Sequence, residues 1–132
     1  MSALGVDRTA RPPVVDADEA LAMVGSGMTV FVHTAAAAPG LLVEALARRA
    51  AELERVVVTH LHTEGPAPYA DESLADRVKV RSLFVGANVR ASVQSGSAEY
   101  VPVFLSEIPY MFRSGALPVD VALVQVSPPD RH

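Results

Sequence analysis

The sequence predicts an α/β protein built on a mostly parallel sheet of about five strands that alternate with helices. Two observations carry this prediction. Five short runs rich in valine and leucine contain few polar residues, which is typical of strands buried on both faces of a sheet. Segments with helical spacing or helix start signals stand between these runs. This alternation is typical of parallel β-α-β units with helices on both faces.

The first third of the chain predicts two helices around one strand. Asp16 is placed to cap a helix over residues 16–24, and Glu19, three residues later, completes a capping box. Residues 28–33 form an apolar run of strand length. Pro39 suits the first turn of a second helix, because its missing N–H has no partner there in any case.

The middle of the chain predicts two further strands. Residues 56–61 and 78–85 are the second and third predicted strands, the first followed by a turn-rich segment and the other stopped by Gly86. A short helix is expected near residues 71–77. Asn88 is placed to cap a helix over residues 88–94, and a glycine follows soon after its end.

The last third predicts a strand, a helix and a final strand. Residues 100–104 form the fourth strand, and Pro102 places it at an edge or a bulge because proline cannot donate to a ladder. Ser106 is expected to cap a helix that ends before Gly115. Residues 119–127 form the fifth strand, and two prolines stop it.

We expect a flexible lead-in over residues 1–15 and one domain over residues 16–132. Half of the chain is apolar, at 50%, which is enough to build a hydrophobic core. Because the last predicted strand ends a few residues before the end of the sequence, we expect a domain that is truncated at its C-terminal end.

Composition argues against several classes of protein. A formal net charge of −4 offers no basic surface for a nucleic-acid backbone. Cysteine is absent, so disulfides and thiolate metal sites are excluded. No apolar run reaches the length of a membrane span, and the start lacks the pattern of a signal peptide. We therefore expect a cytoplasmic protein with no membrane or nucleic-acid partner.

Four segments in order resemble the acetyl-CoA hydrolase/transferase family, and within it the 4-hydroxybutyrate CoA-transferase group. They are HLHTEGPAPY at 60–69, SLFVGANVR at 82–90, YVPVFLSEIP at 100–109 and DVALVQVSPPD at 120–130. The resemblance covers nearly all of the chain but only the N-terminal domain of a longer enzyme. It implies the N-terminal part of a CoA-transferase-like fold.

The resemblance also implies a chemistry. In this family, a glutamate attacks an acyl-CoA and forms an anhydride, and the released CoA thiolate then gives a glutamyl-CoA thioester. An acceptor carboxylate completes the transfer, and water in its place gives hydrolysis. The family's glutamate lies in a second domain, so the resemblance implies that this chain has no catalytic residue of its own and is inactive alone. Acyl-CoA and a small carboxylate are the implied substrates, with no bound cofactor or metal.

Two loops are candidates for binding substrate, because ligands of open parallel sheets lie at the carboxyl ends of the strands. Thr34, Ala35 and Ala36 follow the first strand, where small side chains allow close approach to the backbone. Asn88 and Arg90 follow the third strand and are placed to orient a carboxylate or phosphate. The alternatives are a tightly packed turn, a helix cap at Asn88 and a surface ion pair at Arg90.

Three histidines, His33, His60 and His62, lie on or just after the first two predicted strands. Three imidazoles suit zinc, but no carboxylate stands at metal spacing, so no metal site is expected. Buried or loop-tethering histidines are the favoured interpretation, ahead of a role in lining the substrate cleft.

Two glutamates and two tyrosines complete the set of candidates. Glu107 begins a predicted helix, and we expect it to cap that helix or to contact a second domain, not to act as nucleophile; Glu64 is interpreted in the same way. Tyr69 and Tyr110 are expected to be half-buried packing residues.

Three hypotheses about the chain remain open. It is one part of a split CoA-transferase completed by a second polypeptide, a truncated remnant without activity, or a stand-alone module that binds CoA or a carboxylate. A complementing C-terminal domain or self-association is expected because an unpaired domain surface exposes apolar area.

Overall fold

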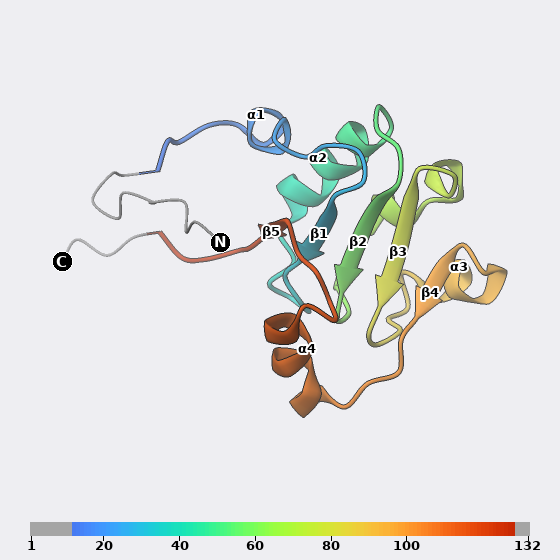
Figure 1. The fold of residues 1–132 in the computed structure, drawn as a ribbon. Coiled ribbons are helices and arrows are strands. Elements are labelled where there is room, and N and C mark those ends of the chain that lie inside the picture. Colours follow the sequence, from blue (N-terminus) through green and yellow to red (C-terminus); the bar gives the residue numbers. More distant parts are fainter. Residues whose placement is uncertain (1–11, 129–132) are drawn as a thin grey trace.

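The computed structural model describes residues 12–128. These residues fold around one five-stranded sheet (Figure 1). The strand order is β4-β3-β2-β1-β5, and every pair is parallel. The α/β fold class predicted from the sequence is therefore confirmed. The strands are β1 (Thr29–Val32), β2 (Val56–His60), β3 (Val78–Ser82), β4 (Ala98–Tyr100) and β5 (Val121–Leu123).

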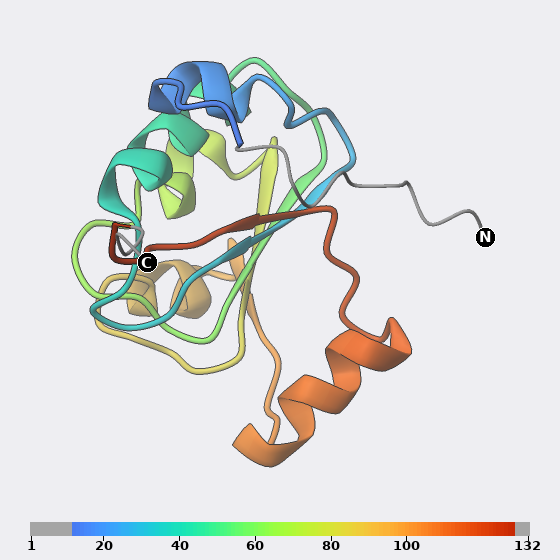
Figure 2. The ribbon, with the colours of Figure 1, turned by 90° about the vertical axis from the view of Figure 1, so that its left-hand side faces the viewer.

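Short helices connect the strands. The α-helices are α1 (Ala17–Leu21), α2 (Gly40–Ala50), α3 (Arg90–Ser95) and α4 (Ile108–Ser114), and the 3-10 helices are η1 (Pro68–Ala70), η2 (Glu72–Leu74) and η3 (Leu105–Glu107). Helices α1, α2 and α3 lie on one side of the sheet, whereas α4 lies on the other side near the carboxyl ends of the strands (Figure 2). None of the described helices is long and apolar enough to cross a membrane.

The main hydrophobic core lies between α2 and one face of the sheet. Inward side chains of β1 and β2, such as Val30 and Val58, are completely buried against Val43 and Leu46 of α2. The stripe of apolar residues along α2 is what places this helix, because helix stability in proteins comes mostly from packing an apolar face.

The second face of the sheet is only partly covered. Phe31 of β1 packs edge-on against Phe112 of α4, with ring centroids 5.3 Å apart. Towards β4 the same face carries charge, since Glu99 forms ion pairs with Lys79 at 3.1 Å and Arg81 at 3.3 Å. The near-continuous apolar strands predicted for a doubly covered sheet therefore hold for β1 and β2 but not for β3.

Several element boundaries differ from the sequence predictions. β4 covers residues 98–100 and not 100–104; the last backbone bond to β3 runs from the Val101 N–H to the Ser82 carbonyl, and Pro102 has no N–H to extend the ladder. β5 is shorter than predicted, because among the described residues it pairs with β1 alone, at the edge of the sheet.

Helix starts were predicted with mixed success. The Asp16 carboxylate accepts the Glu19 N–H at 2.8 Å, which confirms this cap. Asn88 does not cap α3: Val89 occupies that position and makes no side-chain cap bond. Ser106 lies inside η3, so the N-cap of α4 is Glu107, one residue later than predicted. Most of the predicted lead-in over residues 1–15 falls outside the described residues.

Helix α2 provides a test of the core. Leu46 is completely buried, while Leu41 on the same helix is 77% exposed. Leu46→Ala is expected to lower the free energy of unfolding by about 2–5 kcal/mol, because it leaves a cavity against the sheet. Leu41→Ala, the matched control, should change it by no more than about 0.5 kcal/mol. Urea denaturation of both variants measures this, and equal effects would contradict the packing described.

Candidate functional site

The loops that follow β1 and β2 are joined at the carboxyl edge of the sheet. The carbonyl of His62 accepts both the Thr34 hydroxyl and the Ala35 N–H, each at 2.8 Å. The Ala35 carbonyl accepts the Glu64 N–H at 3.2 Å. Of the predicted substrate-facing residues in this loop, Thr34 and Ala35 are thus fixed by hydrogen bonds, and Ala36 is exposed.

Ala35 has an unusual backbone conformation. Its φ angle is +52°, in the left-handed region that costs a residue with a Cβ about 1–2 kcal/mol. The hydrogen bonds to the loop after β2 hold it there. Strain of this kind concentrates at functional sites, although it does not identify a function by itself.

Asn88 joins the loop after β3 to the loop after β2. Its amide nitrogen donates to the Thr63 carbonyl at 3.0 Å, the Thr63 hydroxyl at 3.0 Å and the Gly65 carbonyl at 2.9 Å. The loops after β1, β2 and β3 therefore form one hydrogen-bonded rim, which brings the two predicted groups of site residues to the same edge of the sheet.

Arg90 stands apart from this rim of bonds. It is the first residue of α3, and its side chain is exposed. Within residues 12–128, no ion pair involves its guanidinium group. The alternative of a surface ion pair therefore finds no support among the described residues.

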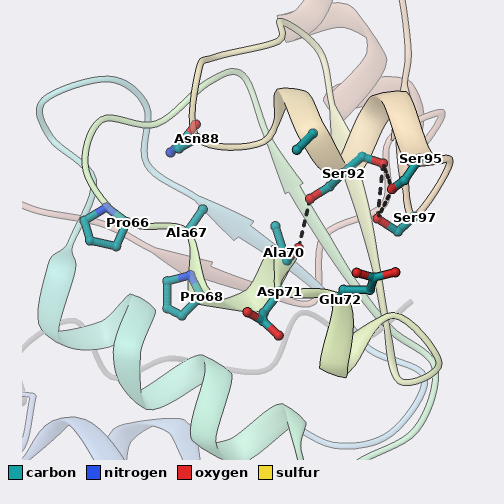
Figure 3. Close-up of a pocket in the computed structure, with 11 residues that line it drawn as sticks. Pro66, Ala67, Pro68, Ala70, Asp71, Glu72, Asn88, Ser92, Ser95 and Ser97 are labelled. Carbon is teal, nitrogen blue, oxygen red and sulfur yellow. Dashed lines mark hydrogen bonds between the residues drawn. The ribbon is translucent and has the colours of Figure 1, made fainter.

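Two hollows flank Asn88. One, of about 460 Å³, lies between the loops after β2 and β3. The other, of about 440 Å³, lies between the segment around η1 and helix α3 (Figure 3). In Figure 3, the Ser92 hydroxyl of α3 points toward η1 and donates to the Ala70 carbonyl at 3.0 Å, whereas the Ser95 hydroxyl turns back to the Ser92 carbonyl at 3.1 Å. The first hollow is lined by His62, Thr63, Glu64, Gly65, Gly86, Ala87 and Asn88.

His60 is a buried polar residue beneath this rim. Its Nδ1 lies 2.8 Å from the Tyr69 hydroxyl and its Nε2 lies 2.6 Å from the Ser82 hydroxyl. Burial, followed by repulsion from His62, lowers the pKa of His60 to about 4, so the ring is neutral near pH 7. The prediction of a buried histidine is confirmed for His60.

Tyr69 is fully buried, not half-buried as predicted. Burial raises its pKa to about 12, against a smaller lowering by the hydrogen bond with Thr63. Thr63, which lies 3.4 Å from the Tyr69 hydroxyl, and Ser82, which lies 2.6 Å from His60 Nε2, were not predicted as members of this cluster. The sequence carries a signal for His60, which continues the period-two alternation of the inward-facing Val56 and Val58 of β2.

The remaining candidates lie elsewhere. His33 accepts the Gln125 N–H at 3.3 Å, and the described residues contain no group of three metal-binding side chains. Glu107 accepts the Phe104 N–H at 3.3 Å and so caps η3. It stands at the N-cap position of α4 but makes no side-chain cap bond there, so the predicted cap of that helix is wrong. Glu64 is exposed, and Tyr110 is 70% exposed, so Tyr110 is not a packing residue.

Residues 10–132 match the model of the acetyl-CoA hydrolase/transferase N-terminal domain. The chain belongs to this family. The family resemblance expected from the four sequence segments is thereby confirmed.

Two similar proteins are CoA transferases. The chain is 41% identical over 117 residues to a succinyl-CoA:acetate/propanoyl-CoA:succinate CoA transferase of Fasciola hepatica, covering 87% of the chain and 24% of that protein. It is 34% identical over 119 residues to the 4-hydroxybutyrate coenzyme A transferase of Clostridium kluyveri, covering 90% and 28%. The chain thus spans about a quarter of the length of these relatives.

Solved structures of the family share the fold. RipA from Yersinia pestis is 26% identical with a TM-score of 0.75, over 89% of this chain and 30% of that one. The 4-hydroxybutyrate CoA-transferase from Porphyromonas gingivalis is 30% identical with a TM-score of 0.67, over 89% and 25%. The described sheet is therefore the N-terminal fold of CoA-transferase family proteins.

The lowered pKa of His60 makes stability depend on pH. The unfolded chain binds a proton near pH 6.5 and the folded chain only near pH 4, so stability is lost as the pH falls through this interval. Between pH 7 and pH 4.5 the contribution of His60 to this loss is about 2–3 kcal/mol. His60→Gln should show a smaller loss by that amount, measured by urea denaturation at both values.

The matched variant His62→Gln keeps the buried ring and should retain most of the loss. An equal pH dependence in His60→Gln and the unmodified chain would contradict the neutral, buried state assigned to His60.

Proposed function

We propose that this chain is the N-terminal domain of a CoA-transferase or acetyl-CoA hydrolase that moves CoA between an acyl-CoA and a small carboxylate. The observation that carries the proposal is the match of residues 10–132 to the family's N-terminal domain, supported by relatives named as CoA transferases. In the proposed reaction, a glutamate outside these 132 residues carries CoA as a glutamyl thioester. Coenzyme A and acyl-CoA are substrates, and the proposed location is cytoplasmic.

The rim at the carboxyl edge of the sheet is the proposed substrate-facing surface. Thr34, Ala35 and Ala36 have small side chains, so a thioester or carboxylate can approach this loop closely. Arg90 offers an exposed guanidinium group suited to a carboxylate or phosphate. Asn88 forms the wall between the two hollows.

We further propose that residues 16–132 act together with a complementing domain. The chain spans about a quarter of its relatives. Phe104 just before η3, Leu105 in η3 and Tyr110 in α4 are exposed, and α4 lies near the carboxyl ends of the strands (Figure 1). Exposed apolar groups gathered near a site favour a protein contact. Self-association through the same surface is the alternative.

Reconstitution tests the proposal. The purified chain is assayed for acetyl-CoA:carboxylate exchange and for thioester hydrolysis, with and without a polypeptide that carries the rest of a family member. The product of the adjacent downstream reading frame is the first polypeptide to try. Exchange is expected only when both are present, because the proposed nucleophile lies outside these residues.

Each other outcome has a distinct meaning. Turnover by the chain alone would contradict a nucleophile outside it and would redirect attention to Glu107. Saturable binding of coenzyme A without turnover in either mixture would favour a stand-alone binding module. Absence of both turnover and binding would favour a remnant.

Arg90 provides a test of the substrate-facing surface. In the reconstituted enzyme, Arg90→Ala should raise the KM for acyl-CoA or carboxylate about tenfold or more, since a charge-assisted hydrogen bond contributes about 1.5–3 kcal/mol. Arg55→Ala is the matched control, because exposed Arg55 precedes β2 at the opposite edge of the sheet. Equal kinetics for Arg90→Ala and the control would remove Arg90 from the site.

A further inference from the structure

A row of polar side chains runs from the hydrophobic core to the rim. We call it the polar chain, and it consists of Ser82, His60, Tyr69 and Thr63. All four side chains are buried. The distances between successive members are 2.6 Å, 2.8 Å and 3.4 Å, and the Thr63 hydroxyl then accepts the Asn88 amide at 3.0 Å. The polar chain therefore ends on a residue of the rim.

The Asn88 amide has no donor left for a ligand. Its nitrogen carries two N–H groups and faces three acceptors, all on Thr63 and Gly65. This orientation also fixes its Oδ1, which is buried and has no hydrogen-bond partner among the described residues. A Cβ atom added at Gly86 would lie only 3.0 Å from that oxygen, so glycine leaves the room that Asn88 needs.

We propose that Asn88 is a positioning residue, which the polar chain holds in place so that it locks the loops after β2 and β3 together. Its effect is to set the shape of the hollow of about 460 Å³ between these loops. That this hollow borders the substrate rests on the proposed function. Asn88 thus acts on substrate through the loops it holds and does not contact the substrate carboxylate.

The chemistry of His60 suits this role. A neutral imidazole has one donating and one accepting nitrogen, and each hydroxyl beside it can donate or accept. Both ring nitrogens are therefore satisfied without a charge in the core. Tyr69 reaches His60 from η1, nine residues further along the chain, so the polar chain also ties the segment after the rim back to β2.

Tyr69→Phe removes the hydroxyl that contacts both His60 and Thr63, while it keeps the buried ring. The measurement is the exchange of the Asn88 side-chain N–H groups with water, followed by NMR in the 132-residue chain. We expect this exchange to become about fivefold faster in Tyr69→Phe, because the Thr63 hydroxyl loses its inner partner. Tyr110→Phe, at an exposed tyrosine, is the matched control and should leave the rate unchanged.

A second pair of variants covers the case in which Tyr69→Phe does not fold. Thr63→Val removes the hydroxyl and should shift the ring-nitrogen resonances of His60, although Thr63 has no hydrogen bond to His60. Thr63→Ser restores the hydroxyl and should restore both the His60 resonances and the slow Asn88 exchange. A residue that only fills space would not give this pattern.

The two proposals fail in different ways. The positioning role would be overturned if the Asn88 exchange rate were unchanged in folded Tyr69→Phe. It would also be overturned if the His60 ring-nitrogen resonances did not shift in Thr63→Val. In the reconstituted enzyme, Tyr69→Phe should raise the KM for acyl-CoA about fivefold, in parallel with the faster exchange of the Asn88 side-chain N–H groups. If the unmodified chain reconstitutes no exchange, the proposed function fails, while the NMR measurements still decide the role of Asn88.

Discussion

The parallel pairing of β1, β2 and β3 is the constraint on which the site depends. Parallel strands in register end at one edge, so the three loops that follow them must begin side by side. Backbone groups in such loops need partners, and here the loops supply them to each other. The His62 carbonyl accepts hydrogen bonds from two donors in the loop after β1, and the Asn88 side-chain amide donates to carbonyls of the loop after β2. The rim is thus a consequence of the sheet.

The sequence predicts the sheet well because its strands are short apolar runs between turn signals. Prediction fails where a boundary depends on a partner strand: the end of β4 is set by a bond to β3, and β5 lies at the edge of the sheet, where residues 12–128 supply one partner strand, β1. For β3 the local signal was present, since Val78, Lys79, Val80 and Arg81 alternate apolar and charged side chains, which indicates one polar face. Only the partner of these charges, Glu99, could not be found locally, because it lies on a neighbouring strand.

Asn88 shows the same limit at the site. An asparagine near a helix start is a good local cap, but the rule fails here, because Val89 occupies the N-cap position of α3 and the Asn88 amide bonds to another loop. Its acceptors lie about 25 residues earlier, on a loop brought close by the β2–β3 pairing. Thr34, Ala35 and Ala36 were placed at the correct edge by the general rule for parallel sheets. The positive φ angle of Ala35 was not predicted, because alanine, unlike glycine, is no sequence signal for the left-handed region.

The buried polar chain explains why this core contains a histidine at all. An apolar side chain at position 60 would fit the pattern of Val56 and Val58 and would avoid the acid sensitivity of a buried imidazole. Buried polar groups are stabilising only when their hydrogen bonds are satisfied, and then they specify one arrangement more sharply than apolar packing does. Here the satisfied arrangement includes Tyr69 and Thr63, which border the rim. The polar chain therefore lowers the free energy of unfolding in acid, and its hydrogen bonds hold the loops above it in a single geometry.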